Sequence, residues 1–106
     1  MTFYRLEEIE QRELLPGLLV RFVHSENMTL AYWEIEAGSE MPLHSHPHEQ
    51  ITNILEGELE FVLGGETKIM GPGSGALIAP DVPHSGKAIS DCRVLDAFHP
   101  VREDYR

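Results

Sequence analysis

The sequence predicts an all-β protein, either a β-sandwich or a small barrel. Two observations carry this prediction. From residue 18 onward the chain is a series of short runs rich in β-branched, aromatic and aliphatic residues. Turn clusters with 9 Gly and 7 Pro in total separate these runs. Short strands with turn signals at intervals of about 8 to 12 residues are typical of sandwiches and barrels.

The segment before residue 18 allows two predictions. Leu6, Ile9 and Leu14 lie near helical spacing, but Pro16-Gly17 ends the segment early. A helical turn and an edge strand fit it equally well.

The remaining elements are all expected to be strands. Gly64-Gly65 predicts a two-residue hairpin loop, because both central positions of a type I′ turn need positive φ. A turn is also expected at Ser25-Glu-Asn27. The expected strands cover residues 18–23, 28–35, 58–63, 66–70, 76–79, 85–89 and 92–98.

Length and charge exclude several functions. The 106 residues predict one domain spanning 1–106, and 42% hydrophobic residues are enough for a core. A formal net charge of −10 argues against nucleic acids and anionic membranes as partners. No run of about 20 apolar residues and no signal-peptide pattern is present. The single Cys92 excludes an intrachain disulfide, so we expect a cytoplasmic location.

The stretch His44-Ser-His46-Pro-His48-Glu-Gln50 is the most informative part of the chain. On an extended strand residues i and i+2 share a face, so His44 and His46 are expected to point the same way and chelate a metal. Gln50 can add a carbonyl oxygen and His84 a third imidazole. A solvated histidine-rich turn without a role is the alternative interpretation.

These residues resemble the two cupin motifs. Gly38, His44, His46, Gln50 and Gly57 match the spacing of the first motif, with Gln50 where Glu usually stands. The segment from Gly75 to Pro80-Asp-Val-Pro-His84 resembles the second motif, with Asp81 where Gly is usual and Ala88 where Asn often follows. The resemblance covers nearly the whole chain and implies a cupin jelly roll, also called a double-stranded β-helix.

The expected ligands are neutral, which restricts the chemistry. Three imidazoles and an amide leave the +2 charge of a divalent metal uncompensated, so the site should attract an anion such as a carboxylate. Zn²⁺, Ni²⁺, Fe²⁺, Mn²⁺ and Cu²⁺ all suit such ligands. The missing carboxylate ligand favours non-redox chemistry over oxygenation. His24, His48 and His99 are expected to be bystanders.

A second set of candidate residues lies near the C-terminus. On an extended strand Cys92, Val94, Asp96 and Phe98 share one face, so Asp96 is expected inside the barrel. A buried carboxylate is paired, hydrogen-bonded or functional, and a raised pKa would suit acid–base catalysis. Alternatively, Asp96 and Arg102 pair with each other and only tie down the tail.

The chain is similar to the KdgF-type cupins of pectin and alginate breakdown, which convert 4,5-unsaturated uronate monosaccharides to linear keto forms. The similarity rests on His-Ser-His-Pro-His-Glu-Gln, Leu-Glu-Gly-Glu-Leu-Glu-Phe and the Asp-x-Phe-x-x-x-Arg tail. It implies catalysis by Asp96 and Arg102 and substrate binding by Phe98 and Arg102. It also implies a small anionic sugar acid as the partner and a metal held by His44, His46, Gln50 and His84.

Two other functions fit the same residues. One is another metal-dependent cupin enzyme, such as a sugar isomerase, a decarboxylase or a dioxygenase. The other is a non-catalytic cupin that binds a metal or a small ligand. A homodimer is expected because sheet edges commonly pair. Residues 2–6 are the candidate strand for exchange between subunits.

Overall fold

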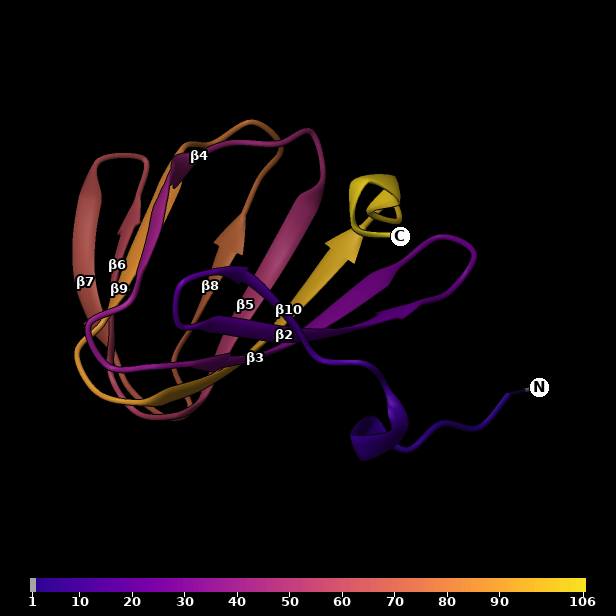
Figure 1. Cartoon of the computed structure of the whole chain (residues 1–106). Coiled ribbons are helices and arrows are strands. Elements are labelled where there is room, and N and C mark those ends of the chain that lie inside the picture. Colours follow the sequence, from indigo (N-terminus) through magenta and orange to yellow (C-terminus); the bar gives the residue numbers. More distant parts are fainter. Residues whose placement is uncertain (1) are drawn as a thin grey trace.

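Two antiparallel sheets face each other and enclose the interior of the protein (Figure 1). The computed structural model describes residues 2–106, and within them the only helices are the 3₁₀ turns η1 (Leu6–Glu8) and η2 (Glu103–Tyr105). No helix in this range has the length and hydrophobicity needed to span a membrane. The all-β jelly-roll prediction is therefore confirmed.

The larger sheet has six strands and the smaller has four. The larger has the order β1 (Arg12–Leu15), β2 (Leu18–His24), β3 (Thr29–Ile35), β10 (Cys92–His99), β5 (Glu49–Glu56), β8 (Gly75–Ile78). The smaller has the order β4 (Glu40–His44), β9 (His84–Ala88), β6 (Leu59–Leu63), β7 (Glu66–Met70).

The segment before residue 18 contains both elements that its sequence allows. The helical turn is η1, and the edge strand is β1, which pairs with β2. Residues 2–5 belong to no strand, and the Tyr4 hydroxyl contacts the Tyr32 hydroxyl at 3.1 Å. Strand exchange by residues 2–6 between two chains stays a prediction.

Strand β10 lies between β3 and β5 and positions several site residues. Its side chains alternate as predicted, with Cys92, Val94, Asp96 and Phe98 all buried. In the register, Val94 stands opposite Trp33 on β3 and Asp96 stands opposite Thr52 on β5. The inward face of β10 is therefore apolar at one end and carries a carboxylate further along.

The core is built from the inward faces of both sheets. Burying a large apolar side chain contributes about 1.5–3 kcal/mol. The buried apolar residues are Leu18, Val20, Phe22, Ala31, Trp33, Ile54, Leu59, Phe61, Met70, Ile78, Ala88, Cys92, Val94 and Phe98. Buried polar residues accompany this core, and most of them belong to the site described below.

Two turns test the sequence predictions on backbone geometry. Gly64 and Gly65 have φ of 55° and 86° and connect the antiparallel strands β6 and β7, which confirms the hairpin. Asp81 stands where the cupin motif usually has Gly, and its φ is 66°, in the left-handed region. Its backbone N–H donates to the His46 carbonyl at 2.8 Å and ties two site loops together.

Candidate metal centre and active site

Three histidines from two neighbouring strands and a loop come together. His44 ends β4 and stands opposite His84, the first residue of β9. Their ring centroids are 4.2 Å apart, and the His46 ring lies 5.0 Å from that of His84. One ring nitrogen of each lies within 4.8 Å of the other two. The structure therefore brings together the three imidazoles expected to bind a metal.

The strand expected to carry both His44 and His46 is shorter than predicted. Strand β4 ends at His44, and His46 lies in the connection to β5. Pro47 follows directly and lacks a backbone N–H, which disfavours a continued ladder. The ring centroids of His44 and His46 are still only 5.8 Å apart. The loop therefore places His46 beside His44, although a strand was expected to do so.

Backbone carbonyls accept a hydrogen bond from one ring nitrogen of each of the three histidines and so determine which nitrogen carries the proton. The Nδ1 atoms of His44, His46 and His84 lie 2.8, 3.0 and 2.9 Å from the carbonyl oxygens of Pro42, His48 and Val82. A carbonyl can only accept, so each Nδ1 carries the proton and donates it. The neutral ring then presents the lone pair of Nε2, which is the form that binds a metal.

Gln50 completes the cluster from β5. Its side-chain Nε2 donates to the Thr52 hydroxyl at 2.9 Å, which turns Oε1 towards Nε2 of His46 at 2.8 Å. Two lone pairs facing each other at this distance repel unless a cation lies near both. Gln50 is buried, whereas its neighbour Glu49 is exposed, so Glu49 cannot take its place, as predicted from the strand alternation.

Burial favours the neutral form of His46 and His84. It lowers the pKa of His84 to about 4 and also lowers the pKa of His46, because a charged imidazolium loses its hydration inside the protein. The Nε2 atom of His84 is buried without a hydrogen-bond partner among residues 2–106. An unpartnered buried lone pair and a repulsive contact nearby both fit a divalent transition metal held by His44, His46, His84 and Gln50.

Asp96 is buried on the inward face of β10, in a cavity that His44 and His84 also line. Its Oδ2 accepts a hydrogen bond from the Trp33 indole at 3.0 Å, and Oδ1 has no hydrogen-bond partner of normal geometry within residues 2–106. Burial raises the pKa of Asp96 to about 6, and the neighbouring polar groups of Thr52, Trp33 and Gln50 only partly oppose this. The carboxyl group can therefore take up and release a proton near neutral pH.

Arg102 does not form the ion pair with Asp96 that one interpretation of the sequence proposed. Its Nε and Nη2 donate to the two carboxylate oxygens of Asp104 at 3.0 and 2.7 Å. The guanidinium lies over the rings of Phe98 and Tyr105, at 4.7 and 4.1 Å from their centroids. Two aromatic rings and a bidentate carboxylate thus hold Arg102 beside the cavity.

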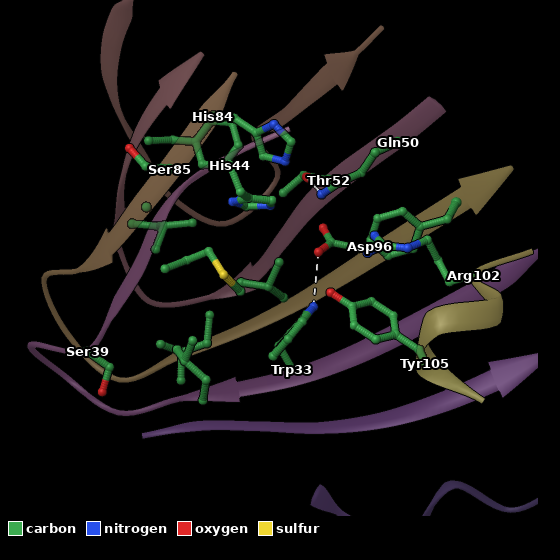
Figure 2. A pocket seen from close by; sticks show the side chains of 18 residues that line it. Trp33, Ser39, His44, Gln50, Thr52, His84, Ser85, Asp96, Arg102 and Tyr105 are labelled. Carbon is green, nitrogen blue, oxygen red and sulfur yellow. Dashed lines mark hydrogen bonds between the residues drawn. The ribbon is translucent and has the colours of Figure 1, made fainter. Parts of the chain in front are cut away.

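The cavity joins these groups into one site. Figure 2 shows the side chains of His44, His84, Gln50, Asp96 and Arg102 directed towards a common space. Phe98 also lines this space, and its ring packs at 5.6 Å from that of His46. All seven sequence-predicted site residues therefore lie in or beside one cavity. The lining also includes apolar side chains from both sheets, namely Leu18, Ile35, Met41, Leu59, Phe61 and Val94.

Among the cavity residues that the sequence interpretation missed, Trp33, Thr52 and Tyr105 lie beside Asp96 or Arg102. Trp33 and Thr52 could have been found from their inward-facing positions on β3 and β5, the strands on either side of β10. Trp33 and Thr52 have the same parity as the buried residues of β3 and β5, and a buried indole N–H needs an acceptor. Tyr105 lies in a terminal turn with no periodicity, so no comparable signal marks it.

A jelly roll that brings three histidines together in its interior is a small barrel that could hold a metal ion. Residues 31–98 match the sequence profile of the cupin domain, and the chain belongs to that family. An uncharacterized protein of Streptomyces coelicolor is 28% identical over 102 residues, which are 94% of this chain and 97% of that protein.

Solved structures share the fold along the whole chain. KdgF from Halomonas sp. superposes with a TM-score of 0.94 and 25% identity, covering 100% of this chain and 99% of that one. An RmlC-like cupin from Shewanella frigidimarina gives 0.95 and 24%, covering 100% and 96%. Ectoine synthase from P. lautus gives 0.85 and 26%, covering 96% and 80%. The chain is a small cupin that is similar to KdgF from Halomonas sp. over its whole length.

Proposed function

We propose that the protein is a metal-dependent enzyme that opens 4,5-unsaturated uronate monosaccharides to their linear keto forms. The observation that carries the proposal is the presence of Asp96, Phe98 and Arg102 in one cavity with four candidate metal ligands. The likeness to KdgF from Halomonas sp. over the whole chain supports it. A small anionic sugar acid is the substrate in this proposal.

The reaction is an isomerisation and needs no oxidant or reductant. A base removes the proton of the anomeric hydroxyl, and the electron pair forms the aldehyde at C1 as the bond between C1 and the ring oxygen breaks. The ring oxygen then belongs to an enolate at C5. A proton delivered to C4 converts that enolate to a ketone. One proton leaves an oxygen and one arrives at a carbon, so the overall composition is unchanged.

Asp96 is the group suited to both proton transfers. A pKa raised to about 6 allows it to accept a proton from the hydroxyl and to return one to the carbon at neutral pH. The Trp33 indole holds Oδ2 at 3.0 Å, which leaves the unpartnered Oδ1 for the substrate. The same environment thus sets both the basicity and the orientation of the carboxyl group.

Arg102 and Phe98 bind the substrate in this proposal. Arg102 uses Nε and one Nη2 proton on Asp104, so its Nη1 edge is left to hold the uronate carboxylate. The Phe98 ring forms an apolar wall for one face of the sugar. A divalent metal bound to His44, His46, Gln50 and His84 supplies Lewis acidity that stabilises negative charge developing on substrate oxygens.

The direct test is turnover of a lyase-generated unsaturated uronate by metal-loaded protein. We expect the ultraviolet absorbance of the conjugated enol to decay faster than the spontaneous reaction, and chelator-treated protein to lose this acceleration. Replacing Asp96 by Asn should abolish the acceleration while metal content stays at that of the wild type. A decay equal to the spontaneous rate overturns the proposal, and consumption of O₂ during turnover would instead indicate a dioxygenase.

A further inference from the structure

Tyr105 is a cavity residue that no motif singled out. It ends η2, and its ring lines the cavity from the C-terminal side. In Figure 2 its hydroxyl points inward, towards Trp33 and Asp96. The phenol therefore reaches the part of the cavity where the carboxyl group of Asp96 lies.

Several contacts hold the Tyr105 ring in this position. It stacks on Phe22 with ring centroids 4.4 Å apart and an interplanar angle of 22°. The Arg102 guanidinium lies 4.1 Å from the ring centroid. The backbone N–H donates to the Arg102 carbonyl at 3.1 Å, and the Tyr105 carbonyl accepts a hydrogen bond from Arg12. A ring fixed by packing on two sides presents its hydroxyl at little entropic cost.

The Tyr105 hydroxyl can donate a hydrogen bond to a ligand. Burial raises the pKa of this phenol, so it keeps its proton at neutral pH. Arg102, the charged group against it, carries only donors and cannot accept the phenolic proton. The proton is thus available to an oxygen in the cavity.

We propose that Tyr105 determines specificity, because its hydroxyl binds a ring hydroxyl or ring oxygen of a sugar acid whose carboxylate Arg102 holds. This inference deepens the proposed function and rests on the same cavity. A carboxylate on an apolar ring would leave the Tyr105 hydroxyl and the buried Oδ1 of Asp96 without partners. Leaving buried polar groups unpaired disfavours such a ligand more strongly than a missing contact at a wet surface does.

The test compares two ligands in equilibrium binding rather than turnover. Galacturonate carries ring hydroxyls, and cyclohexanecarboxylate has a similar ring without them. Calorimetry with metal-loaded wild type should show tighter binding of galacturonate. Tyr105→Phe keeps the stacked ring and should weaken galacturonate about fivefold to tenfold, while cyclohexanecarboxylate stays within about twofold. Tyr32→Phe removes a phenolic hydroxyl on the outer face and should change neither affinity.

Two kinds of binding result overturn the inference, and one result separates it from the proposed reaction. Equal weakening of both ligands by Tyr105→Phe would mean that the residue only supports the cavity wall, and a lowered thermal midpoint would accompany it. If Tyr105→Phe leaves the affinity for galacturonate unchanged, Tyr105 does not determine specificity. The same conclusion follows if the wild type binds neither acid, or binds both equally. Preferential binding of galacturonate without turnover of the unsaturated uronate would retain the role of Tyr105 and reject the proposed reaction.

Discussion

Replacing Asp96 by Asn separates the free energy that is lost by burying its charge from its role in the proposed reaction. The pKa of Asp96 is about 6 in the folded protein, against an ordinary value of 3.8, because burial penalises the ionised form. Between these two values the folded state binds more protons than the unfolded state. The free energy of unfolding contributed by this group therefore falls as pH rises from about 4 to about 6, and the loss persists above pH 6.

The size of the effect follows from the same two values. One pKa unit corresponds to about 1.4 kcal/mol, so ionised Asp96 destabilises the metal-free fold by about 3 kcal/mol above pH 6. Asn has nearly the same shape, keeps an oxygen for the Trp33 indole and carries no charge. We expect chelator-treated Asp96→Asn protein to be more stable than wild type by up to about 3 kcal/mol at pH 7.5, with the difference vanishing near pH 4.

Urea unfolding of both chelator-treated proteins at several pH values measures this difference. Subtracting one curve from the other removes the contributions of the ionisable groups that do not interact with Asp96. The catalytic part of the prediction is a loss of turnover by about 10² to 10⁴ in the metal-loaded variant. A stability difference that does not change between pH 4 and 7.5 would refute the reasoning about burial, whatever the activity.

Four further measurements have expected results. His84→Ala should lower bound metal, measured by elemental analysis, from one ion per chain to a small fraction of that, whereas His99→Gln, an exposed control, should bind it fully. Asp81→Gly should raise the free energy of unfolding by about 1 kcal/mol, because the φ of 66° at this position favours glycine. Gly57→Ala should lower the free energy of unfolding, because the new Cβ would lie 2.1 Å from the backbone carbonyl oxygen of Asp91. Arg102→Lys should raise the KM for the uronate about tenfold or more and leave metal content unchanged. Light scattering of the purified chain should give the mass of a homodimer.

The strands were predictable because their signals are local. The alternation along residues 92–98 and the glycine pair at 64–65 specify which side chains face inward and where the chain turns back. Asp96 was placed inside the barrel by parity alone. The end of β4 at His44 was not predicted, because the loop that carries His46 is held by tertiary contacts such as the Asp81 N–H to the His46 carbonyl.

The partners of the site residues depended on the fold. Spacing suggested that Asp96 and Arg102 could pair, yet Trp33 is 63 positions away from Asp96 and is its actual partner at 3.0 Å. The cross-strand register that places β3 beside β10 decides this, and no local pattern encodes it. Arg102 instead pairs with Asp104, two residues further on, where the 3₁₀ turn brings both side chains together.

A bound divalent metal would give the cavity a charge opposite in sign to that of the chain, and this bears on the size of the ligand. The chain carries a formal net charge of −10, and Glu49, Glu103 and Asp104 are exposed next to cavity residues in the sequence. Inside, Arg102 is paired with Asp104, Asp96 is negative when ionised, and a bound divalent metal would add two positive charges. The carboxylate of a monosaccharide held by Arg102 would lie close to this metal. A polyuronate extending beyond the cavity would pass the exposed carboxylates well within the screening length of about 8 Å, where they repel it. The charge distribution thus favours an acid of one sugar unit over its polymer.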